Sequence, residues 1–381
     1  MSTYGRITDE GLDRLRSQIG VNKPANPNRW NRSSSRDAFR HWAWGIGDDN
    51  PLWLDPDHAR EAGYDDVIAP PTWLYSCSYG PYGPTTRRSR GSGLPGVHAM
   101  HAGDSWRFFR QVLPGEDIDV ERELESVREI DSRYAGRTIE QVILNRYRDS
   151  HGEVLAEYRL HRRSHERSSA KSSSKYADIE PWVYSDEELG TIAENYARES
   201  PRGSKPISWS DVTVGEEIPT RQKGPLTSTS MITYLMGWGS YFCMTDRIAH
   251  NYMRMYPGVV VQDETHNVPD FPERAHWDES FVREIGFPTG YDIGTQRISW
   301  FAHLLTDWIG DTGSVLALDV RLVEPNWMWD TTTLHGRVTH KRLEAGKPHV
   351  DLELWGSCQR GRIHSRGVAS VILGKVSDLT E

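Results

Sequence analysis

The residues that could carry chemistry begin with a short acidic stretch in the first half of the chain. The segment GDDNPLWLDPDHAREAGYDDVIAPP, residues 47–71, opens with the carboxylates Asp48 and Asp49. A carboxylate can act as a general acid or base when a second proton-transfer group lies within hydrogen-bond reach. Position 53, where such a group is expected, holds Trp53, whose indole does not transfer protons at neutral pH. The segment is therefore either an active site or the remains of one.

The second half contains a related segment in which the corresponding position is titratable. WLDPDHAREAGY aligns with HWDESFVREIGF, which places His276 opposite Trp53. Upstream, WAWGIG matches LMGWGS at a smaller shift, so the second half carries an insertion near residues 240–270. A repeat of this kind indicates the duplication of one fold unit.

Each half also carries the elements that must position these residues. Stretches with the pattern of consecutive antiparallel strands lie at 115–130, 137–148 and 153–163 in the first half, and at 315–325, 332–343, 349–360 and 363–374 in the second. Residues 295–311, TQRISWFAHLLTDWIGD, have apolar side chains at i, i+3, i+4 spacing, which predicts a helix with a buried face. The expected fold is a helix wrapped by a curved antiparallel sheet, occurring twice in an α+β protein.

A polar segment separates the two halves. Residues 162–175, RRSHERSSAKSSSK, are rich in serine and have no apolar period, which is typical of a linker. After it, Ser185 and Glu188 have the spacing of a capping box and predict a helix near 185–199. We therefore expect a first unit at 1–161, a linker with a short helix at 162–204, and a second unit at 205–381.

Composition excludes several classes of function. No apolar run is long enough for a transmembrane helix, and the N-terminus lacks the apolar core of a signal peptide. The net charge of −9 argues against a nucleic-acid partner, because phosphate binding needs a basic face. Three scattered cysteines form no metal-binding or disulfide pattern and suggest a reducing compartment. These features predict a cytoplasmic protein without a metal site or a membrane partner.

At the level of motifs, the chain resembles the MaoC-like dehydratases, the R-specific enoyl-CoA hydratases of hotdog fold. GDDNPLWLDPDHA is similar to their hydratase motif D-x-N-P-L-H-x-D, and GYDDVIAPPTW and LPGEDIDVERELESV look like the N-terminal dehydratase domain of two-hotdog members. YDIGTQRISWFAHLLTDWIGDTG is similar to their C-terminal hotdog. The resemblance implies a double hotdog, in which two curved antiparallel sheets each wrap a central helix and form a pseudo-dimer in one chain.

The resemblance also implies a reaction, a hydro-lyase step on an acyl thioester. In that family, an aspartate and a histidine hold one water molecule and add it to, or remove it from, an enoyl thioester. The backbone N–H of a glycine at the start of the central helix donates to the thioester oxygen as negative charge develops. No cofactor is implied, since coenzyme A or an acyl carrier protein enters as part of the substrate.

In the first half, the family's site is incomplete. Asp48 occupies the aspartate position, but Trp53 stands at the histidine and Pro71 at the glycine. Proline has no N–H to offer an oxyanion. We therefore expect a degenerate site, in which Asp48, Asp49 and Asn50 cap the turn and the helix behind it.

In the second half, the histidine and the glycine are both present. His276 is followed at the family spacing by Gly294, in the sequence YDIG with Tyr291, and we expect Gly294 and Tyr291 to contact the substrate. Without this pairing, a lone histidine among tryptophans would more often be a packed core residue. The aspartate position holds Phe271, so the acid partner is open. Asp270 is preferred because it adjoins the insertion, with Glu273 and Asp263 as alternatives.

Other features have two interpretations each. His303 and Asp307, spaced i, i+4 on the predicted helix, form a structural pair or support the site from behind. Arg87, Arg88 and Arg90 lie in a loop that either grips the phosphates of coenzyme A or is simply solvated. A homodimer is one possible assembly.

The alternatives to hydration are a non-catalytic acyl-thioester-binding protein, a hotdog thioesterase, or another acid–base enzyme of a specialised pathway. The sequence does not specify the acyl group, its carrier or the direction of reaction.

Overall fold

The computed structural model describes residues 5–373 except for 25, 27, 79, 81–93, 95–96, 133–135, 167–175, 177–178, 241, 264, 285–286 and 345. The loop with Arg87, Arg88 and Arg90 and most of the serine-rich linker lie outside the described residues.

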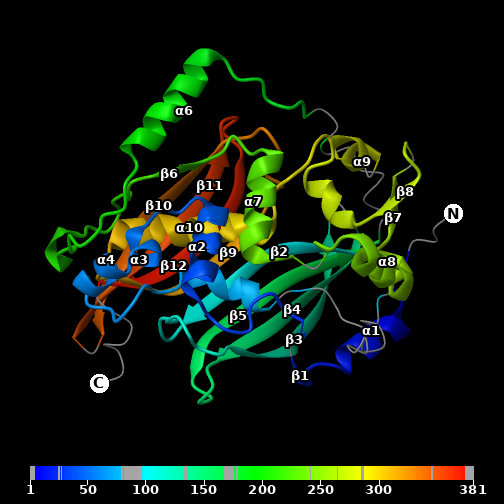
Figure 1. Ribbon diagram of the computed structural model, residues 1–381, viewed down its shortest axis with the longest axis horizontal. Coiled ribbons are helices and arrows are strands. Elements are labelled where there is room, and N and C mark those ends of the chain that lie inside the picture. Colours follow the sequence, from blue (N-terminus) through cyan, green and yellow to red (C-terminus); the bar gives the residue numbers. More distant parts are fainter. Residues whose placement is uncertain are drawn as a thin grey trace.

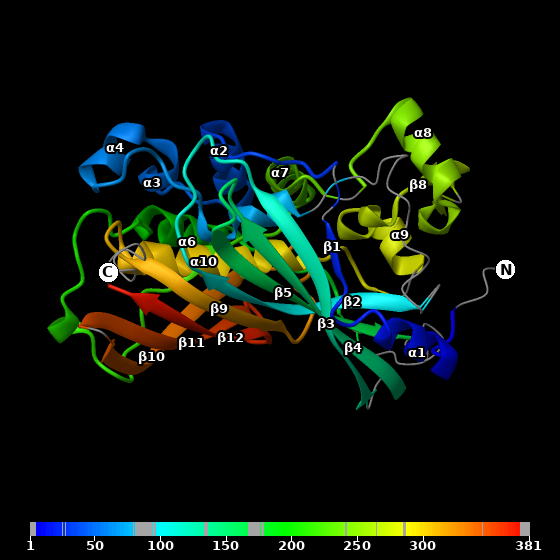
Figure 2. The same ribbon diagram turned by 90° about the horizontal axis from the view of Figure 1, so that it is seen from below.

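Ten strands form one antiparallel sheet that runs through both halves. In sheet order they are β1 (Asn22–Pro24), β3 (Asp119–Ser132), β4 (Gly136–Arg148), β5 (Val154–His165), β2 (His98–Phe108), β9 (Ser314–Leu322), β12 (Ile363–Ile372), β11 (Lys347–Cys358), β10 (Thr332–Glu344) and β6 (Arg221–Lys223). The first-half and second-half strands meet where β2 pairs with β9. The two expected sheets are thus joined edge to edge, with α2 (Arg36–Ile46), α7 (Ser228–Trp238) and α10 (Gly294–Ile309) gathered on one face (Figures 1 and 2).

The strand pattern follows from alternation of side chains along the sheet. In β10, every second residue from Thr332 to Val338 is buried while Thr333, His335 and Arg337 between them are half-buried, as expected for a strand with one face on the core. The seven strands predicted from the sequence correspond to β3, β4, β5 and β9 to β12. The strand that joins the halves, β2, was not predicted, because a bulge at His101–Gly103 interrupts its alternation.

The two halves differ in their central helix. In the second half this helix is α10 (Gly294–Ile309), in which every residue after the first is buried. Its counterpart in the first half is the short 3₁₀ helix η1 (Pro71–Cys77). The predicted helix at 295–311 is therefore confirmed. We attribute the shortness of η1 to its start at consecutive prolines and its 3₁₀ form, which rarely extends beyond one or two turns.

A pair of glycines marks the approximate two-fold relation between the halves. α2 (Arg36–Ile46) packs against α7 (Ser228–Trp238). A Cβ on Gly45 would lie 3.2 Å from the Cα of Tyr234, and a Cβ on Gly237 would lie 2.9 Å from the Cα of Trp42. Each helix thus presents a glycine to the backbone of the other, as expected for a duplicated unit.

The remaining elements surround this core. They are α1 (Asp9–Arg16), α3 (Pro51–Leu54), α4 (Pro56–Glu61), α6 (Asp186–Arg198), η2 (Trp209–Asp211), α8 (Asp246–Met255), η3 (Pro257–Val259), β7 (Val261–Asp263), β8 (Val268–Asp270), η4 (Pro272–His276) and α9 (Glu279–Glu284). α6 begins with the predicted capping box of Ser185 and Glu188. Among the helices in the described part of the chain, none combines the length and apolar character needed to cross a bilayer.

The predicted insertion folds as a small unit of its own. It contains α8 and the β7–β8 hairpin, held by a cluster around Tyr252, Tyr256 and Phe271. The hairpin leads directly into η4, which ends at His276. The insertion therefore determines how the chain enters the second-half motif.

Candidate active site

The first-half motif is closed by its own hydrogen bonds. The Oδ1 of Asp48 accepts from the N–H of Asn50 at 3.0 Å, and its Oδ2 accepts from Trp53 Nε1 at 3.0 Å. Asn50 in turn accepts from the N–H of Leu52 and caps α3. Both Asp48 and Asn50 are buried. The expected capping role of these residues is present, and the indole of Trp53 binds the carboxylate without being able to exchange its proton.

Asp48 also belongs to a buried ionic cluster that spans the two halves. His303 Nε2 lies 3.6 Å from Asp48 Oδ1 and 2.9 Å from Asp307 Oδ2, so the predicted pair of His303 and Asp307 is in contact. Lys223 Nζ lies 2.7 Å from His303 Nδ1 and also donates to the carbonyls of Ile46 and Gly47. Arg221 Nε lies 2.5 Å from Asp307. Lys223 and Arg221 were not anticipated, because β6 is a short strand without a motif.

The charges of this cluster balance without a metal ion. Asp48, His303 and Asp307 offer ligand atoms within 4.8 Å of one another, a grouping that could hold a cation. Two cations, Lys223 and Arg221, already neutralise these carboxylates. A divalent ion bound between the carboxylates would be repelled by both cations. Burial lowers the pKa of His303 to about 3, which keeps the imidazole neutral. The arrangement is that of an ion-pair network rather than a metal centre.

In the second half, His276 is oriented by a backbone carbonyl. Its Nδ1–H donates to the carbonyl oxygen of Tyr291 at 2.7 Å, and the Tyr291 ring packs edge-on at 4.8 Å. Burial lowers the pKa of His276 below its usual value. Because Nδ1 carries the hydrogen, Nε2 holds the free lone pair. The neutral ring can therefore take a proton through Nε2.

Glu273 lies one 3₁₀ turn before His276. In a 3₁₀ helix, side chains at i and i+3 lie above one another, so η4 presents both groups on one face. Burial raises the pKa of Glu273 to about 7, against the hydrogen bond donated by the Ser240 hydroxyl. The pKa of Tyr291 is raised to about 12, first by burial and then by the charge of Glu273. The charge of Glu273 thus acts on Tyr291, the residue that contacts His276.

The other two candidate carboxylates are held by Arg274. Asp270 accepts from the N–H of Phe271, lies 3.7 Å from Arg274 Nη1, and has a side chain that is 49% exposed. Asp263 accepts from Arg274 at 2.7 Å, and this bond is the main reason that its pKa is lowered to about 2. The β7–β8 hairpin turns both groups toward this arginine. Of the three carboxylates that the sequence offers as the acid partner, Arg274 thus holds Asp270 and Asp263, while Glu273 accepts from Ser240.

Gly294 stands at the first position of α10, as expected. The preceding residue, Ile293, has no side-chain acceptor that could cap the helix. The partial positive charge on the first backbone N–H groups of this 16-residue helix is therefore not neutralised by that side chain. A Cβ on Gly294 would lie 2.4 Å from His101 Nδ1 and 2.7 Å from Leu322 Cδ1. Only glycine fits between these groups. His101, on β2, was not singled out from the sequence.

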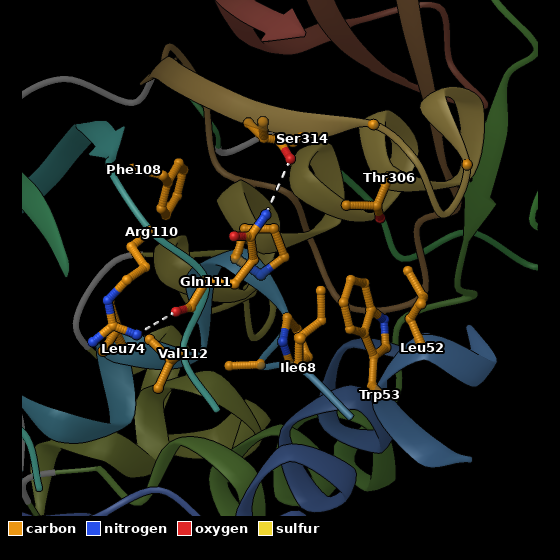
Figure 3. A pocket seen from close by; sticks show the side chains of 16 residues that line it. Leu52, Trp53, Ile68, Leu74, Phe108, Arg110, Gln111, Val112, Thr306 and Ser314 are labelled. Carbon is orange, nitrogen blue, oxygen red and sulfur yellow. Dashed lines mark hydrogen bonds between the residues drawn. The ribbon is translucent and has the colours of Figure 1, made fainter. Parts of the chain in front are cut away.

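A pocket lies beside the degenerate first-half motif (Figure 3). It holds about 620 Å³ of space, part of it open to solvent, and its walls include Trp53, Pro71, Leu74 and Phe108. Gln111 crosses its rim to the Ser314 hydroxyl at 3.1 Å, as Figure 3 shows. The charge of Arg110, also on the rim, is matched by Glu116 and Asp149. The walls are therefore suited to an apolar group.

Comparison with known proteins first identifies the relatives of the first half. Residues 25–158 match the FAS1-like dehydratase domain region. A UPF0336 protein of Parafrankia sp. is 32% identical over 122 residues, which cover 32% of this chain and 77% of that protein. A probable enoyl-CoA hydratase alpha subunit of Thermomonospora curvata is 30% identical over 132 residues, or 32% of this chain. The chain spans 41% of the length of the latter and 63% of a UPF0336 protein of Streptomyces avermitilis.

Solved structures match both halves together. A MaoC-like dehydratase superposes with a TM-score of 0.65 at 19% identity, covering 94% of this chain and 99% of its own. A Mycobacterium tuberculosis protein described as a double hotdog superposes with a TM-score of 0.55 at 12% identity, covering 94% and 97%. With the sheet and helices described above, these matches confirm the double hotdog fold. The chain has the double hotdog fold of the MaoC-like dehydratases, and its first half belongs to the family of the UPF0336 proteins.

Proposed function

We propose that this protein is a hydratase or dehydratase of acyl thioesters, with its acid–base site in the second half. The observation that carries the proposal is the placement of Glu273 and His276 three residues apart on η4, with His276 held by Tyr291. Gly294, at the start of α10, supplies an amide for the thioester oxygen. The enoyl-CoA hydratase name of the Thermomonospora relative supports the same class of reaction.

In the proposed hydration, the two side chains have separate roles. His276 is neutral and takes a proton from water through Nε2, while its Nδ1–H stays on the Tyr291 carbonyl. The hydroxide adds to the β-carbon, and the electron pair of the double bond moves to the thioester oxygen near Gly294. Protonated Glu273 then delivers its proton to the α-carbon. Dehydration is the reverse, and the reaction needs no cofactor beyond the thioester carrier.

The pH dependence of hydration tests the role of Glu273. Its acid form is required, and its pKa is about 7, so kcat/KM for hydration is expected to fall as pH rises through 7. At low pH the rate falls again, because His276 becomes protonated and loses its lone pair. The measurement is the loss of the enoyl absorbance of crotonyl-CoA and of longer and ring-bearing enoyl-CoA thioesters across this range.

The variant Glu273→Gln removes the titrating acid from this profile. We expect kcat/KM to drop by about 100-fold or more, with a residual rate that no longer changes near neutral pH. Glu284→Gln changes an exposed glutamate on α9 and serves as the matched control. A variant that keeps both the wild-type rate and its alkaline limb contradicts the assignment of Glu273.

A second candidate function is binding of an acyl thioester without chemistry, and the first-half pocket favours it. Its apolar walls lie where the family's substrate site would be, beside Trp53 and Pro71. Octanoyl-CoA at 100 times its dissociation constant would then add about 2.7 kcal/mol to the free energy of unfolding. Ala69→Phe places a ring at the pocket wall and is expected to abolish the resulting thermal shift, whereas exposed Ala197→Phe leaves it intact.

Measurements of octanoyl-CoA binding and of enoyl-CoA hydration together distinguish the two candidate functions. Octanoyl-CoA binding that depends on Ala69, with no hydration of any enoyl-CoA thioester, would establish the binding function alone. Release of free coenzyme A from the saturated thioester would instead identify a thioesterase.

A further inference from the structure

A bulge in β2 directs a histidine of the first half at the second-half site. The pairing of β2 with β5 shifts register between His101 and Gly103. Gly103 has a φ of +141°, and a Cβ there would lie 2.2 Å from the carbonyl oxygen of Val320 on β9. β2 therefore approaches the second half closely at this glycine. Bulges of this kind re-aim side chains, and this one is followed by the strand pairing that joins the halves.

His101 is held from behind by a buried carboxylate. Its Nε2 lies 2.7 Å from Asp104 Oδ1, and Asp104 is fully buried. The other oxygen of Asp104 accepts from the Tyr75 hydroxyl, which in turn accepts from Trp106 Nε1 at 3.0 Å. Burial raises the pKa of Tyr75 well above its usual value, so this hydroxyl remains a donor. With Nε2–H on Asp104, the second ring nitrogen, Nδ1, is the one available for other work.

That second nitrogen lies against the start of α10. A Cβ on Gly294 would be 2.4 Å from His101 Nδ1 and 3.1 Å from Cε1, so the edge of the ring occupies the space that glycine leaves open. The His101 side chain is 23% exposed, so part of the ring is open to solvent. The nitrogen is thus beside Gly294, the residue to whose amide the proposed function assigns the thioester oxygen.

The geometry points to His101 as a catalytic residue that the first half contributes to the second-half site, where its Nδ1–H donates to the thioester oxygen beside the Gly294 amide. This inference rests on the proposed hydratase function. With hydrogen on both ring nitrogens, Nε2–H donates to Asp104 and Nδ1–H donates to the oxygen as it becomes an enolate. A second donor of this kind acts mainly on the transition state.

Two variants separate this role from a structural one. In His101→Asn, the side-chain amide nitrogen can overlay Nδ1 and keep a donor at Gly294, but it gives up the contact with Asp104. In His101→Gln, the amide nitrogen can overlay Nε2 and keep the Asp104 contact, but it leaves Gly294 without a donor. The measurements are kcat and KM for hydration of the enoyl-CoA thioesters, binding of unreactive butyryl-CoA, and thermal unfolding of each variant.

The expected order of activity is wild type, then His101→Asn, then His101→Gln. We expect His101→Gln to lower kcat by about 100-fold, as removal of one oxyanion donor does, with butyryl-CoA binding nearly unchanged. The reverse order, or a loss that follows thermal stability, would show a structural role and overturn the inference. Wild-type rates in both variants, with Glu273→Gln inactive, would overturn it while leaving the proposed function standing. A wild-type protein that hydrates none of the thioesters overturns both.

Discussion

Replacing His276 by alanine is expected to lower kcat/KM for enoyl-thioester hydration by about 100- to 10,000-fold. The variant removes the lone pair that activates water, whereas the Gly294 amide and the substrate-binding walls remain. The ring is held by the hydrogen bond from Nδ1 to the Tyr291 carbonyl and by its edge-on contact with the Tyr291 ring, so its removal frees that carbonyl and leaves a space beside Tyr291. The measurement is steady-state hydration of crotonyl-CoA and longer thioesters, with thermal unfolding of the same preparation.

The matched control for this variant is His250→Ala. His250 is an exposed histidine on α8 of the same insertion, and its removal should leave the rate unchanged. Undiminished turnover in His276→Ala would remove the second-half site from consideration. The buried network around Asp48 would then be the remaining place for acid–base chemistry in the described part of the chain.

Lys223→Met is expected to lower the free energy of unfolding by about 3–5 kcal/mol. Lys223 is buried, bonds His303 and two carbonyls, and faces the charges of Asp48 and Asp307. Burial lowers its pKa to about 8, yet it still carries positive charge at neutral pH. Removing that charge leaves two buried carboxylates with Arg221 as their nearest cation. The measurement is urea unfolding at neutral pH.

Lys205→Met provides the comparison for this loss. Lys205 is exposed, and surface substitutions of this kind usually change stability by less than about 0.5 kcal/mol. Equal stability of Lys223→Met and the wild type would mean that the carboxylates of the cluster are protonated in the folded protein. In that case the cluster would not be the ion-pair network described above.

The sequence located the parts of the site that depend on local pattern. The internal repeat singles out His276 as a candidate, and the spacing of the family that the chain resembles singles out Gly294. The capping box of α6 and the buried face of α10 were likewise evident from spacing. These features need only the helical or strand period of their own segment, and that period is present in the sequence.

The rest of the site depends on contacts between distant segments. The choice between Asp270 and Glu273 depends on the β7–β8 hairpin, which turns Asp270 toward Arg274, and on the 3₁₀ form of η4, which aligns Glu273 with His276. A five-residue turn gives no periodic signal for its helix type. His101 and Lys223 act through the opposite half of the molecule, so neighbouring residues in the chain do not indicate their role.

The pairing of β2 with β9 has a consequence for how the chain is made. Ser105 and Asp319 lie opposite each other in this pair and are 214 residues apart in sequence. During synthesis, β2 therefore remains an open sheet edge until the second half has emerged from the ribosome. Unpaired edges of this length are templates for association with other chains. The order in which the halves are translated thus sets a window in which nascent chains can pair with one another.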